Sequence, residues 1–488
     1  MNIDQSNIPK LPEGSFHFVQ RDEKIFDRKF DTKPIGYFRD AFNRFSKNKG
    51  SVVAAAIIIL LLIFAITVPF FSKYTLKDID VNYSYTLPRS EFFSQFGFWN
   101  GYKDVTCNQQ QYDAYEAIGC IVQVYDSYEV EDAGRSNTYY DLQVDSYLTT
   151  GYRYINVTQD ELAAIEAYEV ETGLTVLCPM INLKQIKYPG GESDPNLWYK
   201  HTTKSRAERD EAGNLVDIYM RDDNGDFVYS LEKMGGSQYQ IRVYYYDYYR
   251  YLNGFKPSFL LGSDGFGKDI LIQLAVGARL SFMLSFCVAA INFIIGTIYG
   301  AIEGYYGGWA DMIMERVSDI LAGVPFIVTA VLFQLHIAKT VGVIGALIFA
   351  FILTGWIGTA YRVRTQFYRY KGQEYVLAAR TLGAKDFRII FRHILPNSLG
   401  TIVTSCVLMI PGVIITESSL SYLNIIDLSK ANLTSIGTLL SNGQGSLSTY
   451  PHVIFFPALF ISLLMISFNI FGNGLRDAFN PSLRGSEE

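Results

Sequence analysis

The sequence predicts an α-helical polytopic membrane protein with six transmembrane helices and an inserted α+β domain outside the membrane. Of its 488 residues, 49% are hydrophobic and only 18% are charged, whereas ordinary soluble domains carry about a quarter charged residues. Six apolar stretches are each long enough to cross a hydrocarbon layer of about 30 Å. A long segment between the first and second stretches has a different composition. The net charge of −6 argues against nucleic acid as a partner.

The first apolar stretch, residues 52–71, contains no charged residue. A cleaved signal peptide is the alternative, but about fifty residues precede the stretch and its end lacks a small-residue cleavage site. We therefore expect a true transmembrane helix over 52–72. Glycine and proline inside the later stretches are tolerated because neighbouring helices satisfy the freed backbone groups. Within 271–475 we expect five further transmembrane helices, at 280–301, 317–338, 341–361, 398–416 and 453–472.

The distribution of lysine and arginine predicts the orientation, because these residues accumulate on the cytoplasmic side. Arg39, Arg44, Lys47 and Lys49 lie directly before the first helix, and the segment 362–397 carries eight bases and two acids. With six helices, the segment before the first helix and the segment 362–397 lie on the same side of the membrane, and their bases place that side in the cytoplasm. The sequence thus predicts a multi-pass protein of the cell (inner or plasma) membrane. Residues 1–51 and the tail 476–488 are expected to be cytoplasmic, and 73–270 extracytoplasmic.

The segment 73–270 is too long and varied for a connecting loop. It holds 30 acidic and 18 basic residues and 25 of the 35 tyrosines. Thr158 to Glu161 form a capping box that predicts a helix ending near Gly173. Residues 218–231 predict a β-hairpin with a turn at 222–225, and residues 240–251 are rich in β-prone side chains. Two interpretations of the whole segment stay open: a domain that contacts ligand or partner, and an ordinary acidic domain with tyrosine in its core.

Few residues of the sequence indicate a disulfide, a phosphate-binding site, a metal site or a catalytic site. Cys107 and Cys120 are candidates for a disulfide that closes a short loop. Residues 262–269 nearly spell a phosphate-binding loop, but Asp269 replaces the hydroxyl that would hold Mg²⁺, and no buried strand precedes it. The five histidines are scattered, so we expect no metal site. No catalytic motif occurs, and we expect no catalytic residue and no enzyme activity.

The cytoplasmic segment 374–397 has an informative pattern. It predicts a short helix, a glycine, and a second helix stopped by Pro396. Ala378, Ala379 and Gly383 form a small-residue face that lets another protein approach closely, and Tyr375, Leu382 and Phe387 can act as apolar anchors. The alternative is a helix lying on the bilayer with its bases on lipid phosphates. The pattern alone does not choose between these.

This segment resembles the EAA loop of ABC-importer permeases, which contact the ATPase subunits. Ala378, Ala379, Gly383 and the pair Leu395 and Pro396 match that loop at its spacing, whereas Leu377 replaces the usual glutamate. His393 replaces the usual isoleucine, but the segment 390–397 that contains it is similar to the peptide-transporting subclass. The resemblance implies an ATPase-coupling loop formed by Glu374, Tyr375, Ala378, Ala379, Gly383, Phe387, Leu395 and Pro396.

The resemblance extends over 36–75 and 257–485 to the inner-membrane permease subunits of the dipeptide and oligopeptide transporter family. Segments 260–269, 300–311, 316–325, 417–423 and 468–481 carry it. It implies the type I ABC importer permease fold and half of a translocation pathway for peptides. It also implies a homologous second permease, two ATPase subunits, an extracytoplasmic substrate-binding lipoprotein, and membrane lipid around the helices. ATP and Mg²⁺ would be used by the partners, so no cofactor is expected on this chain.

Charged residues in or beside transmembrane helices are costly and often functional. Glu417 is expected near the outer mouth, as a pathway residue or a paired one. Asp319 is expected near the inner end, paired with Arg316 or a loop base. Two alternatives to a peptide importer remain at this stage: the same architecture with nickel or glycan cargo, and a receptor or adhesin whose active part is the outer domain.

Overall fold

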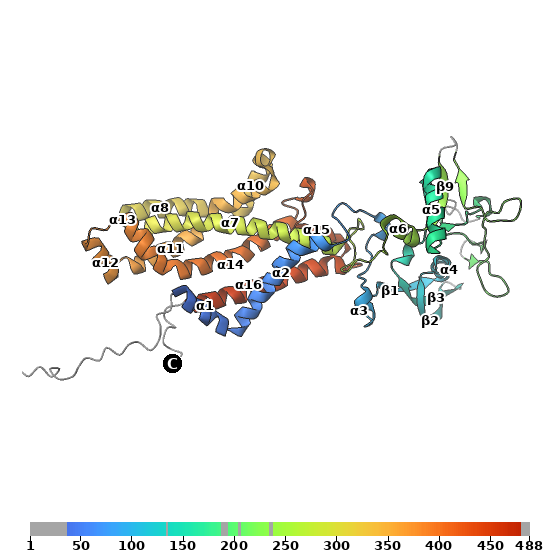
Figure 1. The fold of residues 1–488 in the computed structure, drawn as a ribbon, viewed down its shortest axis with the longest axis horizontal. Helices are drawn as coiled ribbons and strands as arrows, with labels where there is room; N and C mark the ends of the chain where they lie inside the picture. Colours follow the sequence, from blue (N-terminus) through green and yellow to red (C-terminus); the bar gives the residue numbers. More distant parts are fainter. Residues whose placement is uncertain (1–36, 133–134, 187–193, 204–205, 234–237, 480–488) are drawn as a thin grey trace, which may run out of the picture.

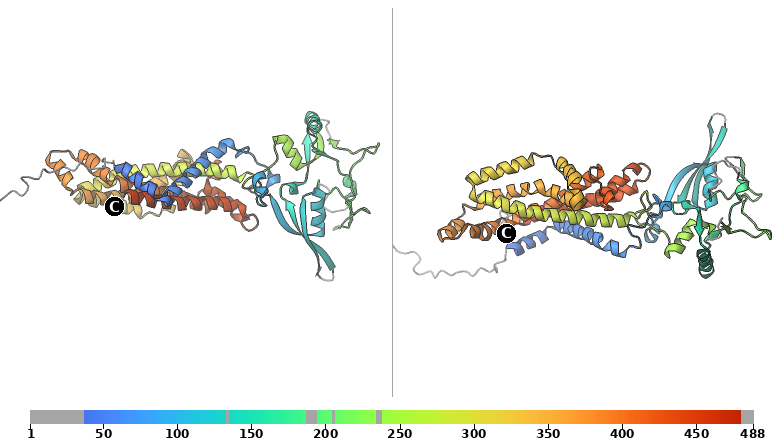
Figure 2. Two further views of the ribbon diagram at one scale, coloured as in Figure 1. Left: turned by 60° about the horizontal axis from the view of Figure 1, so that its bottom comes forward. Right: turned by 90° about the horizontal axis from the view of Figure 1, so that it is seen from above.

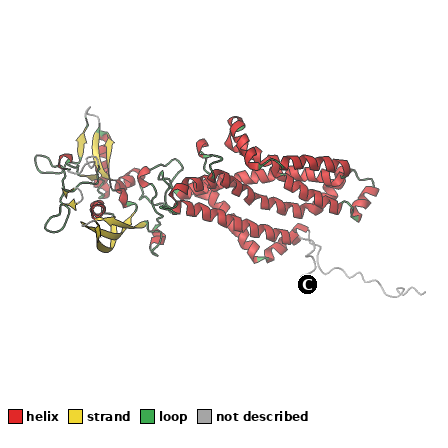
Figure 3. Ribbon diagram, turned by 180° about the vertical axis from the view of Figure 1, so that it is seen from behind, coloured by secondary structure: helices red, strands yellow, loops and turns green. Residues whose placement is uncertain are grey.

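The computed structural model describes residues 37–132, 135–186, 194–203, 206–233 and 238–479. The first 36 and last nine residues of the predicted cytoplasmic ends lie outside these ranges. The molecule is elongated, with a helical bundle at one end and a domain containing the strands at the other (Figures 1 and 3). The bundle consists of α1 (Tyr37–Lys47), α2 (Lys49–Phe71), α7 (Ile270–Tyr306), α8 (Gly308–Ala322), α9 (Phe326–His336), α10 (Ala338–Gly355), α11 (Ile357–Tyr370), α12 (Glu374–Thr381), α13 (Asp386–Arg388), α14 (Leu395–Tyr422), α15 (Ile436–Gly443) and α16 (His452–Phe479).

Among the described residues, five helical segments are long and apolar enough to cross a membrane, and a sixth is obtained when a bent pair is counted as one. The predicted third transmembrane helix, 317–338, is this pair: α8 and α9 meet at 74°. Gly323 ends α8, and Pro325 occupies the N-cap of α9. Because proline has no N–H to donate, one straight helix cannot run through this point.

Close packing of α7 against α11 depends on glycines at every fourth position. A Cβ on Gly296 would lie 2.6 Å from the Trp356 carbonyl oxygen, and one on Gly304 would lie 2.7 Å from the Cβ of Phe367. Between them, Gly300 faces the backbone of Ala360. Small residues at this spacing let membrane helices approach backbone to backbone.

The expectation that Pro396 ends a helix is wrong. A short π-helical segment, Ile389–Ile394, connects α13 to α14, and Pro396 lies in the first turn of α14. Proline is accepted there because a first-turn N–H has no intrahelical partner. The helical run from Asp386 to Tyr422 therefore leads continuously from the loop into the membrane.

The insertion contains two main sheets. In the first, β1 (Tyr102–Asn108), β3 (Arg135–Asp145) and β2 (Ile121–Asp132) are antiparallel neighbours in that order, and the β2–β3 hairpin projects sideways (Figure 2). In the second, β9 (Tyr239–Tyr244) pairs with β4 (Tyr152–Val157), β5 (Leu177–Cys178) and β8 (Ser230–Glu232). The remaining elements are α3 (Glu91–Ser94), α4 (Gln109–Ile118), α5 (Gln159–Thr172), α6 (Tyr245–Asn253), β6 (His201–Thr203) and β7 (Arg206–Ala207).

Local predictions for the insertion had mixed outcomes. The capping box is confirmed: Thr158 and Glu161 bond reciprocally at the start of α5, and Gly173 ends it in a left-handed conformation. The predicted hairpin is present next to its turn, where Arg221 and Phe227 form an antiparallel bridge and the Val228 N–H donates to the Met220 carbonyl. Farther from the turn, β8 pairs with β9 instead. The β prediction over 240–251 is right only as far as Tyr244, where α6 begins. Helical spacing brings Tyr245 and Tyr249 together onto Tyr83.

An aromatic cluster joins the insertion to the bundle. Its buried members are Tyr83, Tyr147, Tyr249 and Phe259. Tyr83 and Phe259 lie on the two chain segments that link the parts, whereas Tyr147 and Tyr249 come from the insertion. Close to them, Gly267 lies against the backbone of Asp80 with no room for a side chain. Tyr85 stacks on Tyr450 just before α16, with ring centroids 4.4 Å apart. The base of the insertion is therefore fastened to the bundle at several points.

Candidate coupling loop and polar contacts of the bundle

The predicted coupling loop lies at the end of the bundle farthest from the insertion (Figure 1). Val376 is fully buried and anchors α12 in a cluster with Val363, Phe367 and Ile389. In contrast, Leu382 is 87% exposed and Phe387 is 72% exposed. Large apolar side chains that are exposed together outside the apolar helices are typical of a protein interaction surface.

The small-residue face of the loop is open. Ala378 and Gly383 are exposed and Ala379 is half-buried. Gly383 has a φ of +81°, and a Cβ added there would meet nothing within 4 Å. Glycine is thus required by the backbone conformation, which few other residues adopt, and the space beside it is free for a partner. Of the other predicted residues, Glu374 and Pro396 are exposed and Leu395 is half-buried.

Hydrogen bonds hold the loop against the ends of two long helices. The Tyr305 hydroxyl, near the end of α7, donates to Asp386 at 2.6 Å and accepts from Arg380 at 3.3 Å. Lys371 donates to the carbonyl of Gly304 at 3.0 Å. On the other side, Asn397 in α14 donates to the Tyr375 hydroxyl at 3.2 Å. These bonds connect the loop to the ends of α7 and α14.

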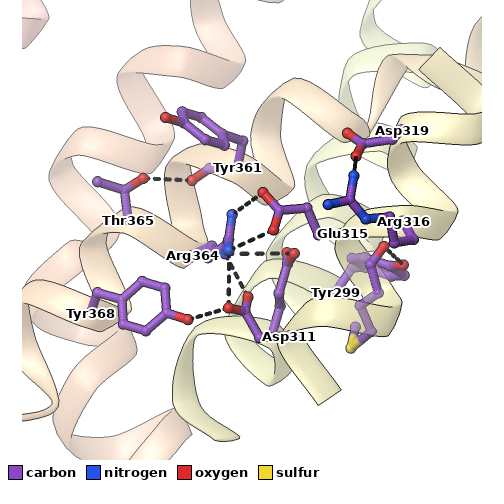
Figure 4. A network of polar contacts seen from close by, with 11 residues as sticks. Tyr299, Asp311, Glu315, Arg316, Asp319, Tyr361, Arg364, Thr365 and Tyr368 are labelled. Atoms are coloured by element: carbon purple, nitrogen blue, oxygen red, sulfur yellow. Dashed lines mark hydrogen bonds and ion pairs between the residues drawn. The ribbon is translucent and has the colours of Figure 1, made fainter. Parts of the chain in front are cut away.

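Sequence reasoning missed the main ionic cluster of the bundle, which centres on Arg364 (Figure 4). Arg364 in α11 forms one bidentate pair with Asp311, at 2.6 and 3.0 Å, and a second with Glu315, at 2.8 and 3.1 Å. Glu303 of α7 lies 3.6 Å away. The Tyr368 hydroxyl donates to Asp311. Two-pronged arginine pairs fix orientation as well as distance, so Arg364 locks α8 against α11. Three carboxylates beside apolar helices were the available signal.

Arg316 and Asp319 form the predicted pair, with Nη1 and Oδ2 3.0 Å apart. Both side chains are more than half exposed. Pairs of this kind contribute about 0–1 kcal/mol to stability. The contact therefore does little to fix α8, in contrast to Arg364.

Glu417 is buried inside the bundle and faces hydroxyl groups. Its carboxylate accepts from Ser281 of α7 at 3.2 Å and from Ser421 at 3.0 Å, with Ser418 at 3.4 Å. It lines a very small cavity with Ser435 and several apolar side chains. A buried carboxylate needs such donors. In this conformation Glu417 links α14 to α7.

The near-match to a phosphate-binding loop at 262–269 has a structural explanation. The Asp264 carboxylate accepts from the backbone N–H groups of Phe266 and Lys268 and from the Gln273 side chain. It occupies the position that a phosphate would need. Asp269 caps α7 by accepting from the N–H of Leu271. The described residues contain no cluster of side chains that could hold a metal ion.

Cys107 and Cys120 are both free in the structure, so the predicted disulfide is not formed there. They share one buried cluster with Leu142 and Val144. Burial raises the pKa of Cys107 to about 11 and that of Cys120 to about 12. The thiolate is the reactive form, so both thiols are protected while the domain is folded.

Comparisons with known proteins agree with this architecture. The family of binding-protein-dependent transport system inner membrane components matches residues 292–485, and the N-terminal transmembrane domain of oligopeptide transport permease C matches residues 36–88. The oligopeptide permease OppC of Bacillus subtilis is 43% identical over 48% of this chain and 76% of that protein. The dipeptide permease DppC of the same organism is 41% identical over 46% of this chain and 68% of that protein.

Among solved structures, one of the MetNI methionine ABC transporter in an inward-facing conformation gives a TM-score of 0.36 at 16% identity. It covers 43% of this chain and 96% of that chain.

The family matches and the similar permeases, together with the bundle of apolar helices, identify a membrane transport permease. The chain belongs to the family of binding-protein-dependent ABC transport permeases, in the group of the oligopeptide and dipeptide permeases. It has the type I importer permease fold and is a transport subunit, not an enzyme. The receptor or adhesin alternative is thereby set aside. Neither family match includes residues 89–291, which contain most of the insertion.

Proposed function

We propose that this chain forms half of the translocation pathway for peptides in an ATP-driven importer. The supporting observation is the exposed apolar loop around Leu382 and Phe387 in a chain of the peptide permease family. The second half comes from a homologous permease, which completes the apolar helix faces left open here. Peptide is the cargo that the names of these relatives indicate. Nickel or glycan uptake is the competing outcome in a transport assay.

Two ATPase subunits bind at the membrane face that carries the coupling loop, and they use ATP and Mg²⁺ there. The loop face of Ala378, Ala379 and Gly383 admits the ATPase surface closely, while Tyr375 and Phe387 supply apolar contacts. Glu374 begins α12, and Leu395 and Pro396 connect the loop to α14. Because Tyr305 and Asn397 bond the loop to α7 and α14, ATPase closure moves these two helices. Such movement switches the pathway between its inward- and outward-facing states.

The coupling loop, the N-terminal segment and the C-terminal tail face the cytoplasm of the cell membrane in this proposal, and the insertion faces outward. The excess of bases in 362–397 supports this orientation. A substrate-binding lipoprotein then delivers peptide at the insertion side.

The test compares two equally exposed apolar residues. Leu382→Asp should abolish uptake of a labelled peptide in cells that lack other peptide importers, because a charge is forced into the ATPase contact. Val170 in α5 is 88% exposed, so Val170→Asp carries the same charge at a site remote from the loop and should keep uptake. Membrane levels of both variants are measured by blotting.

Gly383→Ala and Gly383→Asp form a second pair at the strained backbone position. Both bear the conformational cost of a positive φ, but only aspartate places charge in the contact. Normal uptake by Leu382→Asp and Gly383→Asp would contradict the proposed coupling role. Transport of nickel or a glycan with coupling intact would correct the cargo alone.

A further inference from the structure

An aromatic loop, residues 90–99, lies at the base of the insertion beside the bundle, around α3 (Figure 1). It carries one charged residue, Glu91, and five aromatic ones, Phe92, Phe93, Phe96, Phe98 and Trp99. Its rings pack mainly on one another: Phe92 lies 5.7 Å from Phe96, and Phe93 lies 5.6 Å from Phe98. Phe92 and Phe96 are about two-thirds exposed. An apolar cluster of this kind needs an apolar environment.

The depth of this loop is given by its contact with a transmembrane helix. Trp99 stacks on Phe456, with ring centroids 6.1 Å apart and planes 16° apart. Phe456 lies four residues after His452, where α16 begins, which is about 6 Å along the helix axis. The aromatic loop therefore reaches the first turn of a membrane-crossing helix. Aromatic rings are concentrated at this level, where lipid headgroups meet acyl chains.

A basic pocket of about 490 Å³ adjoins the aromatic loop. Lys73, only two residues beyond the end of α2, and Lys256 both line it. Among the described residues, neither lysine forms an ion pair. Arg89 also lines the pocket, but it is bound to Asp145 at 3.3 Å. The complete lining is Lys73, Tyr74, Arg89, Ser90, Glu91, Phe92, Phe255, Lys256, Ser258 and Leu260, with Glu91 as its one carboxylate.

We propose that the aromatic loop inserts into the leaflet on the insertion side and that Lys73 and Lys256 bind the phosphate of an anionic phospholipid in the pocket. The lysine ammonium groups complement the phosphate charge, and Phe92, Phe255 and Leu260 contact the lipid below its headgroup. The nearby ends of α2 and α16 also carry exposed apolar side chains, Phe71 and Phe455. Lys73 already lies 5.1 Å from the centre of the Phe255 ring, and a lipid phosphate would supply the anion that neither lysine has as an ion-pair partner among the described residues. A bound lipid also covers the exposed rings, and it holds the base of the insertion at the membrane surface.

The first experiment measures depth. A nitroxide is attached at Phe96→Cys in the full-length chain, with Cys287→Ala to remove the exposed native thiol. Vesicles contain phosphatidylglycerol and phosphatidylcholine. The measured quantity is the ratio of the nitroxide's collision rate with oxygen to its collision rate with a water-soluble nickel chelate. This ratio should be several-fold higher at residue 96 than at Val170→Cys, the control on α5. Equal, water-like values at the two sites would overturn the proposal. Protection of residue 96 only after a binding protein or second permease is added would also overturn it, in favour of protein docking.

The second experiment tests the headgroup. Purified full-length chain is analysed by native mass spectrometry after extraction from the same vesicles. Wild type should retain phosphatidylglycerol, and the Lys73→Ala, Lys256→Ala double variant should retain less than half as much. Lys184→Ala, Lys233→Ala removes two exposed lysines elsewhere on the insertion and should leave retention unchanged. Equal retention by wild type and both double variants would overturn the headgroup assignment, as would equal retention of phosphatidylcholine by wild type.

Discussion

The bundle and the insertion place their charged and aromatic side chains in opposite ways. In the bundle, large apolar side chains cover the outside and polar groups meet inside, as Glu417 does with Ser281 and Ser421. In the insertion, tyrosines share the interior with aliphatic residues, and most acidic groups face outward, although Asp113 and Asp145 are buried. Its buried Arg242 is bound by the carbonyls of Pro179 and Pro195 and lies 3.9 Å from the Tyr152 ring. The difference shows that each region is organised for its own solvent, lipid or water.

The strongest test of this comparison is Arg364→Ala. It leaves Glu303, Asp311 and Glu315 clustered without their shared cation. The cluster is partly buried, with Glu315 43% exposed, so we expect a cost between the roughly 0–1 kcal/mol of a surface pair and the roughly 3–5 kcal/mol of a buried one. We expect a large fall in the thermal unfolding temperature of the detergent-solubilised chain. Arg316→Ala, which removes an exposed pair, is the control and should change stability by about 1 kcal/mol or less. Similar effects of the two variants would mean that the α8–α11 lock is not structural.

Gly300→Ala probes close packing inside the bundle. The added methyl meets the backbone of Ala360, so α7 and α11 must separate, at a cost of about 1–3 kcal/mol. Thermal unfolding should detect the loss. Gly412 lies in α14 with nothing within 4 Å of an added Cβ, so Gly412→Ala should be neutral or slightly stabilising. An equal loss of stability in the two variants would mean that the effect comes from the glycine-to-alanine change within a helix and not from the packing of α7 against α11.

Asp269 lies where the two regions meet. Burial raises its pKa from 3.8 to about 7, although the N–H groups of Leu271 and Ile272 partly oppose the rise. Between these values the folded state keeps a proton that the unfolded state has released. Stability from this group therefore falls as pH rises from about 4 to 7. Asp269→Asn keeps an N-cap acceptor, so unfolding measured over this pH range should lose that slope. An unchanged slope would assign it to other groups.

The smallest effect is expected at Cys107 and Cys120. With pKa values of about 11 and 12, both thiols should resist maleimide at pH 8 in the folded chain. After denaturation without reductant, both should label fully, as read by peptide mass spectrometry. Labelling that requires reductant would instead reveal a disulfide in the native protein.

Sequence reasoning performed differently in the two regions, for physical reasons. Transmembrane helices follow from runs of apolar residues, so their number and approximate positions were predictable. Pro325 was the one sequence signal for the 74° bend between α8 and α9. The ionic contacts of Arg364 could not be predicted, because its partners lie 49 to 61 positions away in the sequence and only the fold brings them together. In the insertion, the Thr158 capping box was predictable because it is local. The residues after Tyr244 became helical because tertiary packing on Tyr83 overrides β propensity. The aromatic loop was not singled out from the sequence, because its proposed role depends on where it lies relative to the membrane surface, which the fold determines.

Helix α7 has a mechanical consequence. It is one unbroken helix of 37 residues, which makes it about 55 Å long. Asp269 caps it beneath the insertion, and Tyr305 at its other end bonds Asp386 of the coupling loop. A single rigid helix that is bonded at both ends can move along its axis as one unit, without intermediate conformational steps. The base of the insertion and the loop at the opposite end of the bundle are thus attached to the same rigid element.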